Sequence, residues 1–295
     1  MDTNLPKRHD GDTIAYTNSA KHVDYQDNDA RGQNDLNRYT TNGSVAIPMD
    51  VFERMYFNPE MAVKGQLRRT FGNPTPLALL GFVIASTPLA CTQMGWRGAG
   101  GNGAALIGAF YFFGGMLQTI GSVMEWVIGN TFTMVVFGSY GAFWLTFGAT
   151  LQPVYNAVGA YTEGAITEAE KAAAMATFDA TLAYMVLFVG LLSCIYLVCS
   201  FRTNAIFVMT FTFVVAALLT LSASYWVSAE GKTEQAAKLV KVSGALNFVF
   251  CLLIWYLLLV QLLDSVDFPL ELPVFDLSTK IKGRSDRRTI VEKNA

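Results

Sequence analysis

The chain has 295 residues, of which 52% are hydrophobic and 15% are charged, and its formal net charge is −2. Soluble domains carry about 25% charged residues, so this composition, with a mean hydropathy of +0.34, excludes an ordinary soluble domain. The apolar residues come in blocks of about twenty, the length at which a helix spans the hydrocarbon core of a bilayer. The sequence therefore predicts an all-α integral membrane protein.

The N-terminal part of the chain precedes these blocks. Residues 1–46 are polar with few large apolar side chains, and we predict a disordered cytoplasmic tail. No apolar stretch lies near Met1, so no cleavable signal peptide is expected. The segment 47–72 carries Val51 and Met55 at helical spacing. It is predicted as an amphipathic lead-in at the membrane interface, and an ordinary polar lead-in is the alternative.

A short motif with two prolines opens the first apolar block. Pro74 and Pro76 lack an N–H and are tolerated together in the first turn of a helix. Asn73 is therefore predicted as the N-cap, Pro74 as the first helical residue, and Leu77 onward as a helix entering lipid. The free N–H groups of this turn, with the side chains of Asn73 and Thr75, can bind an anion. Two readings stay open, in which Asn73 either only caps the helix or also contacts a substrate.

Six apolar blocks predict six transmembrane helices within a domain covering 73–265. Glu125 is the only acidic residue inside them, and they contain no Lys or Arg. Basic residues precede the first block, occupy the turn at Arg202 and follow the sixth, which places both termini and the tail 266–295 in the cytoplasm. The blocks are approximately Leu77–Trp96, Ala104–Trp126, Phe132–Leu151, Thr181–Phe201, Ala205–Trp226 and Val242–Leu263.

Residue types that the blocks lack exclude several kinds of function. Both histidines, His9 and His22, lie in the N-terminal tail, so no haem, His–metal or Ser–His–Asp site is expected in the membrane. The four cysteines have no spacing typical of a disulfide framework or a metal site. No Gly-rich phosphate loop is present. We expect no enzyme, no cofactor and no nucleic-acid partner, which leaves a transporter or channel, with a receptor or scaffold as the other class.

The second block carries polar residues at regular spacing. Tyr111, Gln118 and Glu125 are seven residues apart and would share one face of an α-helix. This face is predicted to line a hydrated path and to take part in proton coupling, because ionisable residues in a membrane are functional candidates. The alternative is that Glu125 lies in the wet interface and that Gln118 bonds to a neighbouring helix.

Small and hydroxyl residues predict how the second and third blocks pack. Gly114, Gly121 and Gly141 are expected to allow close approach of neighbouring helices. Ser139 and Tyr140 lie at mid-depth, where each hydroxyl needs a hydrogen-bond partner.

Two stretches of sequence carry a family resemblance. The run Asn73-Pro-Thr-Pro-Leu-Ala-Leu-Leu-Gly-Phe82 resembles the Asn-Pro-Ala-Pro-Leu-Gly-Leu signature of the acetate uptake transporter family, which includes succinate–acetate permeases and fungal Gpr/Fun-type proteins. The resemblance covers about residues 58–265. The second and longer match comprises Phe112-Phe113-Gly114-Gly115, Gln118, Gly121, Glu125, Gly129-Asn130-Thr131-Phe132 and Ser139-Tyr140-Gly141-Ala142-Phe143-Trp144-Leu145-Thr146.

The resemblance implies six-helix protomers that form a homo-hexamer, each with its own path. It implies proton-linked transport of acetate and related short monocarboxylates, which we expect at the plasma membrane. A hydrophobic constriction would include Phe82, Tyr140 and a third residue that is Leu in the family. Counting forward from Arg202 places Phe211 there, so a different limit on substrate size is expected. The resemblance also implies that the signature motif takes part in substrate entry. This motif comprises Asn73, Pro74, Thr75, Pro76 and Leu77.

Two other functions remain open from the sequence. The fungal members of the family suggest ammonium or ammonia export, for which Glu125 is the only acid placed to meet a cation. The Ser and Thr residues of 1–46 suggest instead a membrane sensor or signalling protein regulated by phosphorylation of that tail.

Overall fold

The computed structural model describes residues 71–270, 272–277 and 280, which belong to one unit, Met49–Ala295. The predicted tail 1–46 and nearly all of the lead-in 47–72 lie outside the described residues.

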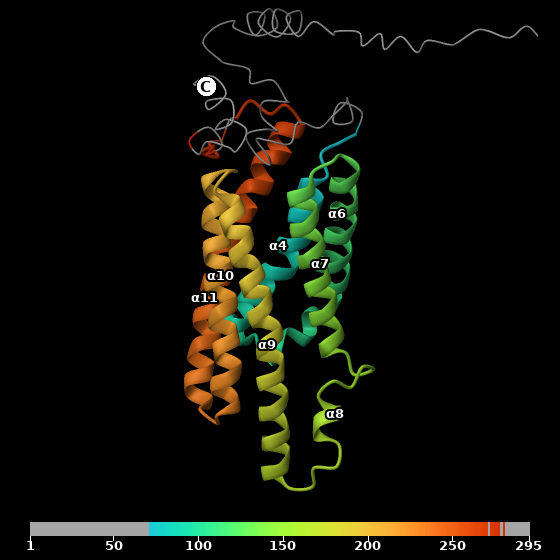
Figure 1. The fold of residues 1–295 in the computed structure, drawn as a ribbon, viewed down its shortest axis with the longest axis vertical. Helices are drawn as coiled ribbons and strands as arrows, with labels where there is room; N and C mark the ends of the chain where they lie inside the picture. Colours follow the sequence, from blue (N-terminus) through green and yellow to red (C-terminus); the bar gives the residue numbers. More distant parts are fainter. Residues whose placement is uncertain (1–70, 271, 278–279, 281–295) are drawn as a thin grey trace, which may run out of the picture. The chain divides into compact units, whose positions relative to one another are not determined.

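Six helical spans form the described part of the chain, and each is long and apolar enough to cross a membrane. Five are single helices, and the second is built from several shorter segments (Figure 1). This confirms the all-α membrane fold with six spans. The cytoplasmic location of the termini stays a prediction. The spans are α4 (Thr75–Met94), the composite span Gly103–Val127, α7 (Thr131–Leu151), α9 (Glu168–Ser200), α10 (Ala205–Ala229) and α11 (Thr233–Ser265).

α9 and α11 both start earlier in the chain than their apolar blocks do. α9 begins at Glu168, well before the predicted Thr181, because a capping box starts it there. The Thr167 hydroxyl accepts from the N–H of Glu170 at 3.2 Å, and the Glu170 carboxylate accepts from the N–H of Thr167 at 2.9 Å. Hydropathy could not show this start, since the first turns of α9 are polar. The lower part of α9 and the short α8 (Gly159–Thr162) reach beyond the other helices (Figure 1).

The second span changes its helical geometry along its length. It runs through a 3₁₀ segment, η2 (Gly101–Leu106), a short α5 (Ile107–Ala109), a π-helix, η3 (Phe110–Leu117), and α6 (Gln118–Val127). A π-helix bonds from residue i to i+5 and so needs an extra residue in each turn. The face predicted for Tyr111 and Gln118 assumed α geometry throughout, and η3 interrupts it between them.

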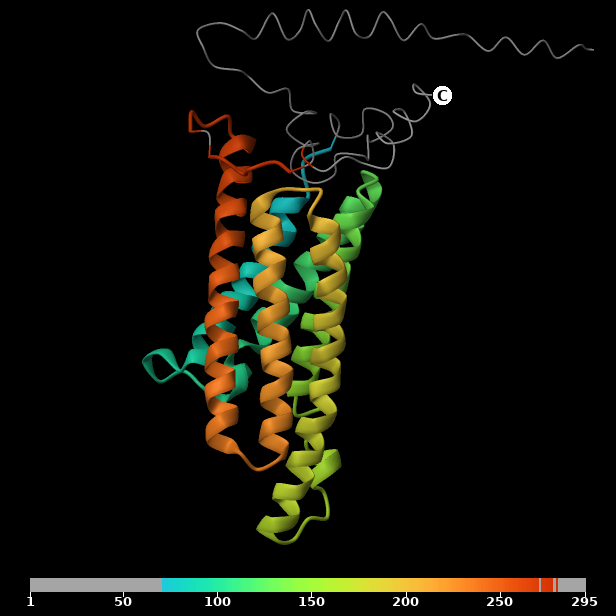
Figure 2. The same ribbon diagram turned by 60° about the vertical axis from the view of Figure 1, so that its left-hand side comes forward.

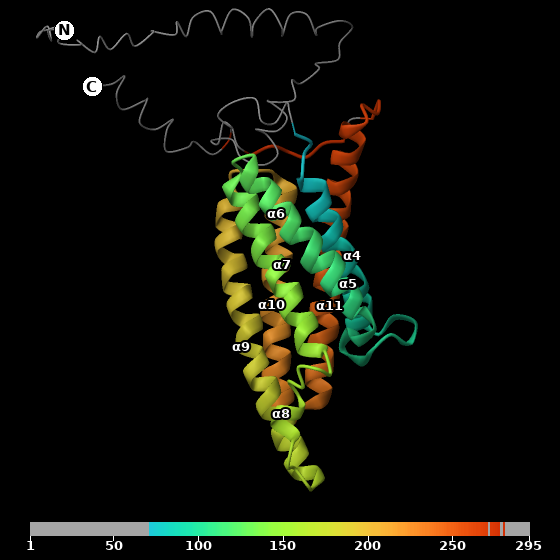
Figure 3. The ribbon, with the colours of Figure 1, turned by 90° about the vertical axis from the view of Figure 1, so that its right-hand side faces the viewer.

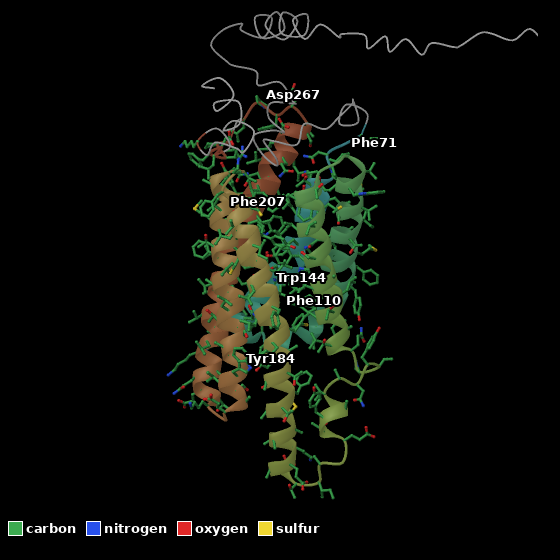
Figure 4. The ribbon with its side chains drawn as sticks, viewed as in Figure 1. Phe71, Phe110, Trp144, Tyr184, Phe207 and Asp267 are labelled. Atoms are coloured by element: carbon green, nitrogen blue, oxygen red, sulfur yellow. The ribbon has the colours of Figure 1, made fainter. Side chains whose placement is uncertain are left out.

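The spans pack as a bundle in which α10 lies between α9 and α11, and α11 also packs on α4 (Figure 2). The second span packs on α4 and α7 (Figure 3). Glycines allow these contacts, as predicted: a Cβ at Gly121 would lie 2.7 Å from Ala78 Cβ, and one at Gly114 would lie 2.6 Å from Trp144 Cγ. We call the end of the bundle where Phe71 and Asp267 lie the terminal end, and the opposite end the far end (Figure 4).

The segment 272–277 returns to the turn between α9 and α10. Asn204 and Asp276 form an isolated antiparallel bridge. The N–H of Ala205 donates to the Phe275 carbonyl at 3.0 Å, and that of Leu277 to the Thr203 carbonyl at 2.9 Å. This part of the predicted tail 266–295 is therefore bound to the bundle.

Candidate transport path

Two cavities lie between the helices in the described part of the chain, with volumes of about 50 and 30 Å³. The smaller one, the near cavity, is lined by α4, α7, α10 and α11 and includes Leu79 and Phe207. The larger one, the far cavity, is lined by Trp144 and Gln93 among other residues, and α9 also contributes to its wall. Phe207 lies nearer the terminal end than Trp144 does (Figure 4). Since one water needs about 10–15 Å³ of such space, both cavities can hold small solutes.

The two cavities share three residues of their walls, Phe82, Tyr140 and Val214. The rings of Phe82 and Tyr140 pack edge to face, with their centroids 5.8 Å apart. The Tyr140 hydroxyl lies 2.8 Å from Ser193 Oγ, which supplies the partner expected for it and fixes the ring. Apolar side chains from α4, α7 and α10 therefore separate the cavities.

Phe211 lies next to Phe82, Tyr140 and Val214, on the side of the near cavity. Phe211 is buried and lines the near cavity together with Phe82 and Tyr140. Val214, three residues later on the same helix face, lines both cavities. Sequence reasoning did not single out Val214, although its spacing from Phe211 was a usable signal.

A chain of polar side chains lines the far cavity, and sequence reasoning missed it as well. Ser86 Oγ donates to Asn247 Oδ1 at 2.8 Å, and Asn247 Nδ2 donates to Gln93 Oε1 at 3.2 Å. Ser86 and Gln93 are seven residues apart on α4, the same spacing that drew attention to the second span. Trp144 adds an indole N–H that is buried with no acceptor among the described residues.

Glu125 lies in a cluster near the terminal end and is fully buried. Thr75 Oγ1 donates to its Oε1, while Asn130 Nδ2 and Thr133 Oγ1 donate to its Oε2 at 2.8 and 3.3 Å. The carboxylate of Glu125 is thus shielded from solvent, and its position relative to the membrane interface stays a prediction. This carboxylate joins the start of α4 to the start of α7.

Tyr111 and Gln118 line neither cavity. Gln118 is fully buried, and neither atom of its amide has a hydrogen-bond partner among the described residues. The interhelical bond weighed for it is thus not made. Tyr111 lies against Gly148, where an added Cβ would be 3.2 Å from its ring. A role of this face in lining the path stays a prediction.

Asn73 uses both ends of its amide at the start of α4. Its Oδ1 accepts from the Thr75 N–H at 3.1 Å, and its Nδ2 donates to Gln261 Oε1 at 3.4 Å. The helix is assigned from Thr75 with Pro74 as N-cap, one residue later than predicted, a shift within the usual spread of helix boundaries. The capping role of Asn73 is therefore present.

Comparison with known proteins agrees with this arrangement. Residues 54–279 match the GPR1/FUN34/yaaH family. The chain belongs to this family. The resemblance stated from the sequence is therefore confirmed.

Several relatives in this family are fungal. "Protein alcS" of Aspergillus fumigatus is 43% identical over 235 residues, which cover 80% of this chain and 86% of that protein. "Acetate permease A" of Emericella nidulans is 28% identical over 219 residues, covering 74% of this chain and 71% of that protein. "Ammonia transport outward protein 3" of Saccharomyces cerevisiae is 36% identical over 93 residues, covering 32% and 34%.

A solved structure shares the fold. The bacterial acetate channel SatP matches with a TM-score of 0.52 and 20% identity, covering 69% of this chain and 99% of that chain. Acetate permease A, ammonia transport outward protein 3 and the SatP channel are transporters or channels by name, in agreement with the expectation that the chain is not an enzyme.

Proposed function

We propose that the protein transports acetate and related short monocarboxylates through a path that crosses each protomer. The observation that carries this proposal is the pair of cavities in series, which meet at Phe82, Tyr140 and Val214 inside the six-helix bundle. The acetate permease and the acetate channel among its relatives support the choice of substrate.

The apolar contact between the cavities acts as the constriction of the path. Burial of Phe82 and Tyr140 leaves little polar surface there to replace the water around an ion, and narrow hydrophobic constrictions can exclude hydrated ions by dewetting. A small methyl-bearing acid fits such walls better than an inorganic ion does. Phe211 lines the near cavity next to this contact, at the position that the family resemblance implies for the third constriction residue.

Transport is coupled to protons through Glu125. It is a buried carboxylate in a predicted membrane span, and because such groups are costly to bury, they are candidates for a function. Its bonds to Thr75 and Thr133 place it beside the signature motif at the start of α4. We propose that Asn73 and Thr75 receive the substrate next to this group.

Uptake of radiolabelled acetate by vesicles containing the purified protein tests the function. We expect uptake well above that of protein-free vesicles, and faster uptake when protons are more concentrated outside. Equal uptake in the two kinds of vesicle, with and without the gradient, would rule the proposal out.

Ammonium or ammonia is the second candidate cargo, favoured by the ammonia transport relative. A cation site would need acceptors, whereas both oxygens of Glu125 already accept from Thr75, Asn130 and Thr133. Acetate is therefore preferred. Inhibition of acetate uptake by ammonium salts, compared with equal concentrations of choline salts, distinguishes the two cargoes.

The setting of the transporter is also proposed. The outward side of the second span exposes large apolar residues, which suits contact with lipid or with other protomers of a hexamer. We place the protein in the plasma membrane with both termini in the cytoplasm. The exposed residues include Phe112, Phe113, Ile120, Val123 and Trp126.

A further inference from the structure

The far cavity has a mostly apolar wall that carries a few uncharged polar side chains. Among the described residues, its lining includes Ser86, Gln93 and Asn247 and contains no Asp, Glu, Lys, Arg or His. Transfer of an unpaired carboxylate from water into such surroundings is very costly, because no opposite charge replaces its hydration. An uncharged solute with hydrogen-bonding groups meets no such penalty.

The hydrogen bonds within the cavity wall do not use every donor and acceptor of the Gln93 side-chain amide. Ser86 donates to Asn247, and Asn247 donates to Gln93 Oε1. That oxygen has a second lone pair, and the chain of hydrogen bonds between Ser86, Asn247 and Gln93 does not use Gln93 Nε2. Asn247 therefore holds Gln93 in place while the amide of Gln93 keeps a donor and an acceptor for a ligand.

A second donor comes from the opposite wall. Trp144 is only 3% exposed and lines the same cavity. Its Nε1–H has no partner among the described residues, and a buried polar group without a partner is destabilising. We take an acceptor group of the bound solute as its partner.

We propose that the far cavity binds the protonated form of a short monocarboxylic acid, with the carboxyl group paired to the amide of Gln93. This rests on the proposed function. A carboxylic acid carries an O–H donor beside a carbonyl acceptor, and a primary amide carries the complementary N–H and carbonyl. The Trp144 N–H is the further donor, Asn247 is a positioning residue, and the apolar wall receives the methyl group.

The proposal predicts that acetamide binds in the same cavity. Acetamide has the size of acetic acid, carries a donor and an acceptor, and bears no charge. In vesicles, we expect acetamide to compete with labelled acetate for uptake. Gln93→Leu should weaken inhibition by acetamide about tenfold, the loss expected for the two hydrogen bonds of the amide. Thr212→Val, which removes an exposed hydroxyl bonded to the Val208 carbonyl, is the matched control and should change nothing.

A binding measurement keeps the test independent of transport. Saturation-transfer NMR on the acetamide methyl group, with the purified protein in detergent, should give a signal that Gln93→Leu reduces and Thr212→Val leaves. Asn247→Leu is a second variant, which should reduce the signal less because it only releases Gln93.

The outcomes separate this inference from the proposed function. If wild-type vesicles take up acetate but acetamide neither competes nor gives a signal that depends on Gln93, the inference is wrong and the transport function stands. If wild-type vesicles take up no acetate, the transport function is wrong, and a signal that depends on Gln93 would still support an uncharged ligand in the cavity.

Discussion

Glu125 joins two helix starts through one carboxylate. Thr75 belongs to the first turn of α4, and Asn130 and Thr133 lie at the start of α7. Free N–H groups at a helix N-terminus carry a partial positive charge and favour an anion nearby. A change in the charge of Glu125 would therefore alter the contact between α4 and α7, which together supply Phe82 and Tyr140.

We expect Glu125→Gln to remove the response of acetate uptake to a proton gradient. The amide of Gln cannot titrate. Its N–H₂ group would also take the place of one of the two carboxylate oxygens and face the hydrogen-bond donors there. Loss of a hydrogen bond to a charged group also predicts about 1.5–3 kcal/mol lower stability. Uptake with and without a gradient, and thermal unfolding in detergent, measure both effects. Glu168→Gln, in an exposed pair with Lys171, is the control. A folded Glu125→Gln protein that still responds to the gradient would contradict the coupling role.

Asn73 can be tested for a role beyond capping. Asp keeps the cap through its carboxylate, whereas Ala removes it at a cost of about 1 kcal/mol. Asp also lacks the amide donor and repels an anion. If Asn73 contacts the substrate, Asn73→Asp should lower uptake as much as Asn73→Ala does, with stability close to that of the wild type. Normal uptake by the Asp variant would reduce Asn73 to a cap.

At the scale of elements, close packing depends on the glycines of the second span. A Cβ at Gly121 would meet Ala78 of α4, so Gly121→Val forces the two helices apart. Overpacking of this kind costs about 1–3 kcal/mol, and we expect a lower midpoint of thermal unfolding. Gly108 has nothing within 4 Å of an added Cβ. Gly108→Val is the matched control, and an equal loss in both variants would show that the contact with Ala78 is not the cause.

The helices themselves were largely predictable, and their details were not. Six apolar blocks suffice to predict six spans, because lipid demands long apolar helices. The early start of α9 depends on the capping box at Thr167, which lies outside any apolar block. The π-helix η3 was invisible, since hydropathy does not depend on the helix type. The spacing argument for Tyr111 consequently rested on a geometry that the chain does not keep.

At the scale of the whole molecule, the path was harder to predict than the fold. Lipid and protein interior are both apolar, so a sequence does not show which side of a helix faces the centre. Phe82, Tyr140 and Phe211 were proposed through the family resemblance. Val214 and Gln93 carry a spacing signal in the sequence, but the cavity that they line forms only when α4, α10 and α11 are brought together.

Val214 offers a direct test of the path, because it lines both cavities. Val214→Phe should fill the space where the two cavities meet and so close the path. We expect acetate uptake to fall at least tenfold, which corresponds to about 1.4 kcal/mol or more in the activation free energy. Phe211→Ala should widen the near side and admit longer acids such as butyrate. Val198→Phe, at an exposed position on α9, is the control. Normal acetate uptake by Val214→Phe, together with unchanged selectivity of Phe211→Ala, would place the constriction elsewhere.

α9 is longer than a bilayer is thick. Its 33 residues span about 50 Å, against about 30 Å of hydrocarbon. The excess lies at the far end, where α8 precedes it (Figure 1). A protease site inserted between Gly164 and Ala165 should be cut on intact cells if the termini are cytoplasmic, and only after lysis if they are not. The protruding part of α9 thus allows the orientation of the protein in the membrane to be determined on a gel, without knowledge of the transported substrate.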